Sequence, residues 1–250
     1  MRRLIVTLDG PAGSGKSTVA RRLAKRLGLD FLDTGAMYRG ITAKAVDRGI
    51  DVVEEDYAVV ELARNAKIHF DWDNDPPSLI INEIDVTPRL RDSDVVSRVS
   101  DVAAMSAVRD VLVKAQRRIG EAHPGLVTEG RDQGSVVFPD AAVKFYLDAS
   151  PQVRAERRAN QLRELGKHVD LESIRESIVL RDRKDSSRKT APLVCPEDAE
   201  RIDTSGMSLD DVLDYVEKRV RESPAFQQNE DAGSMPGGSA EDIPRVGGEA

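Results

Sequence analysis

The residues with the clearest chemical signature lie near the start of the chain, in the run Gly10-Pro11-Ala12-Gly13-Ser14-Gly15-Lys16-Ser17, which Thr18 follows. The run matches the pattern G-x-x-x-x-G-K-[ST] in full, and in such loops the glycines let backbone N–H groups surround phosphate oxygens. We expect Lys16 to neutralise the β- and γ-phosphates of a nucleotide and the Ser17 hydroxyl to ligate Mg²⁺. The alternative, a glycine-rich turn with a surface lysine, is weaker because the whole pattern matches. A dinucleotide-binding loop does not fit, since Thr18 stands where its third glycine would be.

The segments on either side of this loop are those that a phosphate site needs. Residues 4–8 form a short apolar run typical of a buried parallel strand. After the loop, apolar residues recur at helical spacing from Val19 to Leu27, and Gly28 is placed to end the helix. The N-terminus of this helix adds partial positive charge at the loop. Strand, loop and helix together therefore predict a nucleotide site.

Arginine dominates four further polar clusters, each beside or just after a predicted strand end. They are the runs at residues 33–39 (DTGAMYR), 129–132 (EGRD), 154–158 (RAERR) and 181–188 (RDRKDSSR). In a parallel sheet such loops meet at the carboxyl edge, next to the phosphate-binding loop. Guanidinium groups gathered there repel one another unless phosphates lie between them, and bidentate arginine contacts suit phosphate recognition. Any single arginine taken alone is equally well explained as part of a solvated helix face.

The rest of the chain alternates strand and helix patterns. Further short strands are expected at residues 30–32, 126–128, 143–147 and 201–203, with helical patterns between them, which indicates an α/β fold with a parallel central sheet. Residues 67–87 break the alternation, because apolar positions alternate there around a Pro76-Pro77 turn. We expect two or three short antiparallel strands in this segment, as a small inserted subdomain.

Composition limits the class of protein. The 250 residues suffice for one sizeable domain with an insert, and 40% hydrophobic with 32% charged residues is typical of a soluble globular chain. The net charge of −7 disfavours a protein that coats nucleic acid. No apolar run approaches the ~20 residues of a membrane helix, and the N-terminus does not resemble a signal peptide, so a cytoplasmic location is expected. Cys195 and the three histidines lack metal-ligand spacing, so no structural zinc or haem site is expected.

The C-terminal segment has a different composition from the body. Residues 224–250 carry five acidic residues against one basic residue, with five glycines, three prolines and almost no apolar periodicity. Such a segment cannot bury enough surface to offset the entropy of ordering it. We therefore predict a folded domain over residues 1–223 and a disordered acidic tail over 224–250.

Five motifs, taken together, resemble one family. GPAGSGKST, DTGAMYR, EGRDQGSVVFPDA, RAERR and RDRKDSSRKTAPL, in this order and spacing, are similar to those of bacterial cytidylate kinases, which are P-loop nucleoside monophosphate (NMP) kinases. The resemblance runs from about Leu4 to Val220. It implies a three-layer P-loop kinase fold with a parallel central sheet, a small NMP-binding insert at about residues 67–92, a lid at about residues 154–168, and a monomeric enzyme.

The resemblance also implies roles for individual residues. Those expected to bind the acceptor nucleotide are Thr34, Arg39, Ser100, Arg109, Arg131, Asp132, Arg181, Asp185 and Arg188. Those expected to act on the transferring phosphoryl group are Lys16, Arg131, Arg157, Arg158 and Arg181. Residues 10–18 would bind ATP, with Ser17 on the metal. Gln133 and Ser135 differ from the family, which usually has an apolar residue and a threonine there.

The implied reaction is ATP plus CMP or dCMP giving ADP plus CDP or dCDP, with Mg²⁺ as cofactor and no stable nucleic-acid or membrane partner. Asp132, Arg109 and Ser100 would read the cytosine edge. One rival is a kinase for another monophosphate such as UMP, which would differ only at the base pocket. The other is an ATPase that transfers phosphate only to water. A guanine-reading N-K-x-D segment, usual in GTPases, does not occur.

Overall fold

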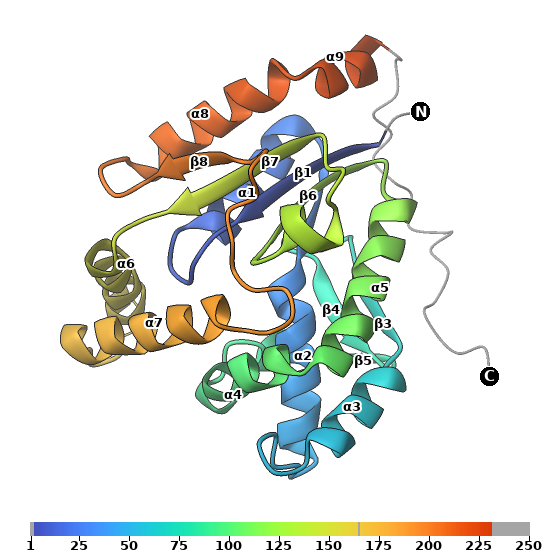
Figure 1. Cartoon of the computed structure of the whole chain (residues 1–250), viewed down its shortest axis with the longest axis vertical. Coiled ribbons are helices and arrows are strands. Elements are labelled where there is room, and N and C mark those ends of the chain that lie inside the picture. The colour runs from blue at the N-terminus through green and yellow to red at the C-terminus, as the bar shows by residue number, and fades with distance from the viewer. Residues whose placement is uncertain (1–2, 165, 232–250) are drawn as a thin grey trace.

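A parallel five-stranded sheet forms the centre of the molecule. The computed structural model describes residues 3–164 and 166–231, and the strand order is β2-β6-β1-β7-β8 (Figure 1). All four neighbouring pairs in this sheet are parallel. In sheet order the strands are β2 (Asp30–Asp33), β6 (Gly125–Gly130), β1 (Leu4–Asp9), β7 (Val143–Asp148) and β8 (Glu200–Asp203).

Helices cover both faces of the sheet because its strands are apolar on both sides. Ile5 and Leu126 pack in one hydrophobic cluster, whereas Leu4, Val6 and Val127 pack in the other. The first face is covered by α2 (Thr34–Asp47) and α5 (Ser106–Ala122), and α3 (Asp56–Arg64) and α4 (Ser93–Ala104) pack against these two helices. The second is covered by α1 (Lys16–Leu27), α8 (Leu209–Arg221) and α9 (Pro224–Asp231). The predicted three-layer α/β fold with a parallel central sheet is confirmed.

A second, antiparallel sheet lies between α3 and α4 in the sequence. Its strands β3 (Ile68–Asp71), β4 (Ser78–Ile81) and β5 (Ile84–Asp85) pair in the order β3-β4-β5, and the one-turn helix η1 (Thr87–Arg89) follows. The expected short antiparallel strands are therefore present. A Cβ at Gly40 of α2 would lie 2.6 Å from Leu79 and 2.8 Å from Ile81, so glycine at this position lets the helix and the small sheet pack closely.

Two helices, α6 (Pro151–Glu164) and α7 (Leu171–Ser186), pack against each other beyond the carboxyl ends of the strands (Figure 1). Most of α6 and the residues that follow it make up the segment that we predicted as a lid, at about residues 154–168. Residue 165, inside that segment, lies outside the described residues, and the lid stays a prediction.

The prediction of disorder from Pro224 onwards is wrong for the first eight residues. They form α9, and Phe226 is only 2% exposed because its ring packs in the cluster that α1, α8 and the sheet share. The composition of the whole tail concealed this one aromatic anchor. Residues 232–250 lie outside the described residues. Within the part of the chain that is described, no helix is both long and apolar enough to cross a bilayer.

Candidate active site at the carboxyl edge of the sheet

The glycine-rich loop joins β1 to α1 at the carboxyl edge of the sheet. A Cβ at Gly10 would lie 2.1 Å from the carbonyl oxygen of Leu147 on β7, so only glycine lets the loop leave the sheet this closely. Gly15 precedes α1 with a φ of 89°, a left-handed conformation that glycine adopts without strain. The predicted arrangement of strand, loop and helix is confirmed, and it directs the N-terminus of α1 toward any anion bound in the loop.

Lys16 is the first residue of α1 and is 5% exposed. Its Nζ donates to the carbonyl oxygen of Pro11 at 3.2 Å and lies 3.8 Å from Oε2 of Glu129. Burial, together with the positive charge of Arg131, lowers the pKa of Lys16 to about 7. A phosphate placed against this amine would raise its pKa again.

Ser17 and Glu129 bring two oxygen groups together beside the loop. The Ser17 hydroxyl donates to Oε1 of Glu129 at 2.7 Å, although the two residues are far apart in sequence. Burial and the nearby charge of Asp33 raise the pKa of Glu129. In the described residues no group of three or more His, Cys, Asp or Glu side chains could hold a metal ion. A cation here would therefore need oxygens from Ser17, from Glu129 and from a bound nucleotide, and hard oxygen donors are those that Mg²⁺ prefers.

The DTGAMYR motif connects β2 to α2. The Asp33 carboxylate caps α2 by accepting from the Ala36 N–H at 2.9 Å, and it pairs with Arg39 at 2.7 Å. Burial opposes ionisation of Asp33, but Arg39 and the hydrogen bonds to this carboxylate outweigh it and lower its pKa. The Thr34 hydroxyl donates to the carbonyl oxygen of Glu129 at 2.7 Å. This motif is thus fixed to the end of β6, and Arg39 Nε remains buried without a partner among the described residues.

Three arginines surround one carboxylate at the end of α7. Arg131 Nε lies 2.9 Å from Oδ2 of Asp185, and Arg188 lies 3.9 Å from Oδ1 of the same side chain. Although burial opposes it, the charges of Arg131, Arg181 and Arg188 lower the pKa of Asp185. Burial and the neighbouring Arg131 lower the pKa of Arg181 to about 10, and its Nε is buried without a hydrogen-bond partner in the described chain. The motifs at 129–132 and 181–188 therefore meet as predicted, with more positive charge than Asp185 neutralises.

Arg109 and Asp132 form a buried ion pair. Arg109 also donates to the carbonyl oxygen of Ala103 at 3.2 Å, and its guanidinium lies 5.5 Å from the centre of the Tyr38 ring. Ser100 lies on α4, about one turn before Ala103. These three predicted base contacts therefore lie in one region. Arg188 is close to it, because the charges of Arg109 and Asp132 both act on the pKa of Arg188.

Sequence comparison identifies the family. The cytidylate kinase family model matches residues 6–222. The chain belongs to the cytidylate kinase family. It is 43% identical to a cytidylate kinase of Streptococcus suis, over 89% of this chain and 98% of that protein. A cytidylate kinase of Clostridioides difficile is 40% identical, over 88% of this chain and 99% of that one.

The chain also matches part of a longer relative. A bifunctional pantoate ligase/cytidylate kinase of Trichormus variabilis is 47% identical over 88% of this chain, and the chain spans only 42% of its length. Among solved structures, a shikimate kinase of Bacteroides thetaiotaomicron aligns at 13% identity and a TM-score of 0.45, over 88% of this chain and 97% of that one. That likeness is too distant to add to the argument. The family resemblance inferred from the motifs is confirmed.

The three arginines of the RAERR motif occupy different environments in this chain. Arg157 donates to Thr204 Oγ1 at 3.0 Å and to the Thr204 carbonyl at 2.6 Å, with a longer contact of 3.4 Å to the carbonyl of Ser14. Arg158 is exposed and reaches Gln161 on its own helix. The structure therefore places Arg157 beside the phosphate-binding loop and Arg158 away from it.

Arg154 was expected only as part of the arginine-rich start of the lid, with no site role of its own. It is buried, donates to the carbonyl oxygens of Ala12 (3.0 Å) and Ala149 (2.8 Å), and pairs with Asp182 at 2.6 Å. Its side chain thus connects the phosphate-binding loop to α7. The sequence signal was its place at the start of the RAERR motif, which does not distinguish the buried Arg154 from the half-buried Arg157 and the exposed Arg158.

Asp9 is a second buried residue that the motifs did not single out. As the last residue of β1 it accepts from the N–H groups of Gln133 (2.9 Å) and Gly134 (2.7 Å), and burial raises its pKa to about 7. The Gln133 side chain exchanges hydrogen bonds with Thr128 (3.0 Å) and Gln116 (3.2 Å). Gln133, one of the two departures from the family pattern, therefore belongs to a buried polar network.

Proposed function

We propose that the chain transfers the γ-phosphoryl group of ATP to CMP or dCMP, giving ADP and CDP or dCDP. The observation that carries the proposal is the excess of guanidinium groups beside the phosphate-binding loop. Arg131 and Arg181 both act electrostatically on Lys16, and Arg39 acts on Arg181. A site for one nucleotide does not need this much charge, whereas a site for a second phosphorylated molecule does.

Alignment and charge account for the reaction without a covalent intermediate. Negative charge spreads over the transferring phosphoryl group, and preorganised cations stabilise that charge. Lys16 would contact the donor phosphates, and Arg131 and Arg181 would lie between donor and acceptor. The acceptor is an ionised phosphate, so Asp132 and Glu129 are assigned to binding and not to proton abstraction. Closure of the lid expected at about residues 154–168 would exclude water, which otherwise competes as acceptor.

The base would be read by the pair of Arg109 and Asp132. Cytosine presents an N4 amino donor beside the N3 and O2 acceptors, so a carboxylate can accept from N4 while a guanidinium donates to N3 or O2. Both side chains are almost fully buried, which makes an unmatched hydrogen-bonding group on the base costly. Ser100, one helical turn before Ala103 on α4, would join them. The deoxy and ribo substrates share this base edge.

Mg²⁺ would be held by the Ser17 hydroxyl together with nucleotide phosphates, with Glu129 as a neighbour. The 2.7 Å contact between Ser17 and Glu129 supports this, because it places two oxygen groups at the start of α1 beside Lys16. The metal would neutralise charge on the phosphates. The remaining proposals, that the enzyme is monomeric and acts in the cytoplasm on small molecules alone, rest on the sequence.

The test is an ADP-release assay with CMP, dCMP, UMP, AMP and GMP, and with no acceptor. We expect rapid release with CMP and dCMP and very slow release without an acceptor. Preference for UMP would support the rival monophosphate kinase and overturn the base assignment alone. Equal release with and without acceptors would identify an ATPase and overturn the whole proposal.

A further inference from the structure

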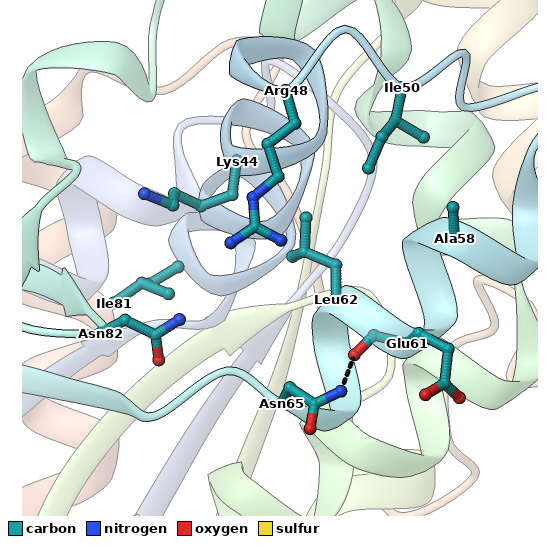
Figure 2. A pocket seen from close by; sticks show the side chains of 9 residues that line it. All are labelled: Lys44, Arg48, Ile50, Ala58, Glu61, Leu62, Asn65, Ile81 and Asn82. Carbon is teal, nitrogen blue, oxygen red and sulfur yellow. Dashed lines mark hydrogen bonds between the residues drawn. The ribbon is translucent and has the colours of Figure 1, made fainter.

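A cavity of about 320 Å³ lies between α2, α3 and the turn that joins β4 to β5. Its walls include Lys44 and Arg48 from the end of α2, Leu62 from α3, and Ile81 with Asn82 from the small sheet. Figure 2 shows Lys44 and Arg48 on one side of the hollow and Asn82 and Asn65 on the other. The volume falls at the lower end of the range for small-molecule sites, about 300–1,000 Å³.

The cavity is separate from the site of phosphoryl transfer. Thr34, at the start of α2, belongs to the active-site edge, and Lys44 lies ten residues later on the same helix. At 1.5 Å per residue the two positions are about 15 Å apart along the helix axis. Neither the phosphate-binding loop nor any of the clustered arginines lines the cavity. A ligand bound here would not occupy the place of either nucleotide.

Two cations that line the cavity, the partly buried Lys44 and the exposed Arg48, are not neutralised by the described part of the protein. Within residues 3–164 and 166–231, neither Lys44 nor Arg48 makes an ion pair or a side-chain hydrogen bond. The one acidic residue of the lining, Glu61, pairs with Arg64 at 2.9 Å, and in Figure 2 its carboxylate points away from both cations. Lys44 and Arg48 are four residues apart on one helix, a spacing at which like charges repel. The chain as a whole has a net charge of −7, so this positive charge is a local excess. A bound anion would relieve the repulsion between Lys44 and Arg48.

Cations near the end of a helix also complement its dipole, and this is the simplest alternative explanation. The helix dipole explains why a lysine and an arginine occur at positions 44 and 48. It does not explain the cavity beside them or the residues of its other walls. The floor is apolar, since Leu62 is 8% and Ile81 1% exposed. The far wall carries the amide groups of Asn65 and Asn82. Asn65 Nδ2 donates to the Glu61 carbonyl at 2.7 Å and Asn82 Oδ1 accepts from the Lys67 N–H at 2.8 Å, so a ligand would meet the remaining Oδ1 of Asn65 and Nδ2 of Asn82. A site with two cations on one wall, amides opposite and an apolar floor fits a ligand that joins an anionic group to an apolar body.

We propose that this cavity binds a small organic anion, in which a phosphate, carboxylate or sulfonate group is attached to an apolar ring. The anionic group would lie against Lys44 and Arg48, and the ring against Leu62 and Ile81. The site is additional to the two nucleotide sites of the proposed kinase reaction.

The probe is anilinonaphthalene sulfonate, whose fluorescence rises in apolar surroundings. It is titrated into the full-length protein with ADP and CMP at saturating concentrations, which fill both nucleotide sites without a γ-phosphoryl group to transfer. The K44Q/R48Q variant is expected to bind it at least about tenfold more weakly, because two charge-assisted contacts are lost. N-phenylnaphthylamine, the same ring system without the sulfonate, should bind wild type and variant equally.

The matched control is K114Q/R118Q, which removes an exposed lysine and arginine at the same four-residue spacing on α5. It should bind the probe as the wild type does. The A58F variant tests the cavity by volume alone, because Ala58 lines it, and should also weaken binding. Displacement of the probe by naphthyl phosphate or by naphthoate would distinguish a phosphate from a carboxylate ligand. Equal binding by wild type, K44Q/R48Q and A58F, with kinase activity showing that all are folded, would overturn the proposal.

Discussion

The Asp9 carboxylate accepts a 2.9 Å hydrogen bond from the backbone N–H of Gln133. A second bond, of 2.7 Å, comes from Gly134. Asp9 is the residue before the phosphate-binding loop, and Gln133 follows Arg131 and Asp132 directly. One buried carboxylate therefore fixes the phosphate-binding loop relative to the segment that carries Arg131 and Asp132.

The buried state of Asp9 predicts a pH dependence of stability. Its pKa is raised from 3.8 to about 7 in the folded protein, so the folded state holds a proton that the unfolded state loses at lower pH. Its contribution to stability is fully present below about pH 4 and is lost as the pH rises to about 7. D9N mimics the protonated form. The thermal midpoint of the wild type minus that of D9N should fall between pH 4 and pH 7 and then level off.

The control for this measurement is D140N, which changes an exposed aspartate in the turn before β7, away from the carboxyl edge where Asp9 lies. Its midpoint should follow that of the wild type at every pH. A wild-type minus D9N difference that rises with pH would mean that the hydrogen bonds from Gln133 and Gly134 prevail over burial.

Lys16→Ala should abolish turnover without unfolding the protein. Loss of one preorganised electrostatic contact to a transition state costs on the order of 10²-fold or more in rate. The matched control is Lys25→Ala on the same helix, because the Lys25 side chain is 79% exposed. CDP formation is measured for both, with circular dichroism as the check on folding. Near-normal activity of a folded Lys16→Ala protein would refute the role of this amine.

Lys16 also predicts proton uptake when nucleotide binds. Its pKa is lowered to about 7 in the protein alone, and the negative phosphates of ATP favour the charged amine. ATP affinity should therefore fall as the pH rises above 7, approaching about tenfold per pH unit. Isothermal titration calorimetry in buffers of different ionisation enthalpy measures the uptake directly. The K16R variant, whose side chain stays charged, should show less uptake, and equal uptake in the two proteins would exclude Lys16 as the source.

Much of the site could be predicted from the sequence because its motifs are local. The loop at residues 10–18 and the runs at 33–39 and 129–132 follow strands that the apolar pattern locates, and parallel pairing then brings them to one edge. The run at 181–188 was expected beside a strand end but lies at the end of helix α7, and it reaches the site because that helix packs there. What could not be predicted are contacts between distant residues. Asp9 with Gln133 and Arg154 with Ala12 depend on how buried elements pack. No spacing in the chain encodes either contact.

The helix α9 shows the same limit at the level of the fold. The composition of residues 224–250 predicts disorder, yet Phe226 finds a place in a core that other segments build. Burial of one aromatic ring depends on the surface it meets, and that surface comes from α1, α8 and the central sheet. The average composition of a long segment therefore cannot predict that one of its side chains is buried against the rest of the protein.

Phe226→Ala should destabilise the protein although it lies outside the predicted domain. Removing a buried phenylalanine side chain costs about 3–5 kcal/mol. In a chain of this size that corresponds to a lower thermal midpoint by roughly 6–20 °C. The control is Gln227→Ala, which changes the exposed neighbour on α9. An unchanged midpoint for Phe226→Ala, measured by differential scanning calorimetry, would show that α9 adds nothing to the core.

The pair of Arg109 and Asp132 gives the sharpest test of substrate choice. Uracil places a carbonyl where cytosine has its N4 amino donor, so the Asp132 carboxylate would face an acceptor. A hydrogen bond to a charged group is worth about 1.5–3 kcal/mol, or roughly 10- to 100-fold in specificity. Asp132→Ala should therefore lower kcat/KM for CMP far more than for UMP, and the CMP/UMP ratio should shrink.

The competing explanation is that Asp132 only orients Arg109, with which it pairs in the structure. If Arg109 donates to O2, the acceptor that cytosine and uracil share, loss of its orientation would reduce kcat/KM for CMP and UMP by similar factors. Asp110→Ala, an exposed carboxylate beside Arg109 on α5, is the matched control and should change neither value. An unchanged CMP/UMP ratio in a folded Asp132→Ala enzyme would therefore assign Asp132 to positioning Arg109 and leave the reading of the base to the arginine.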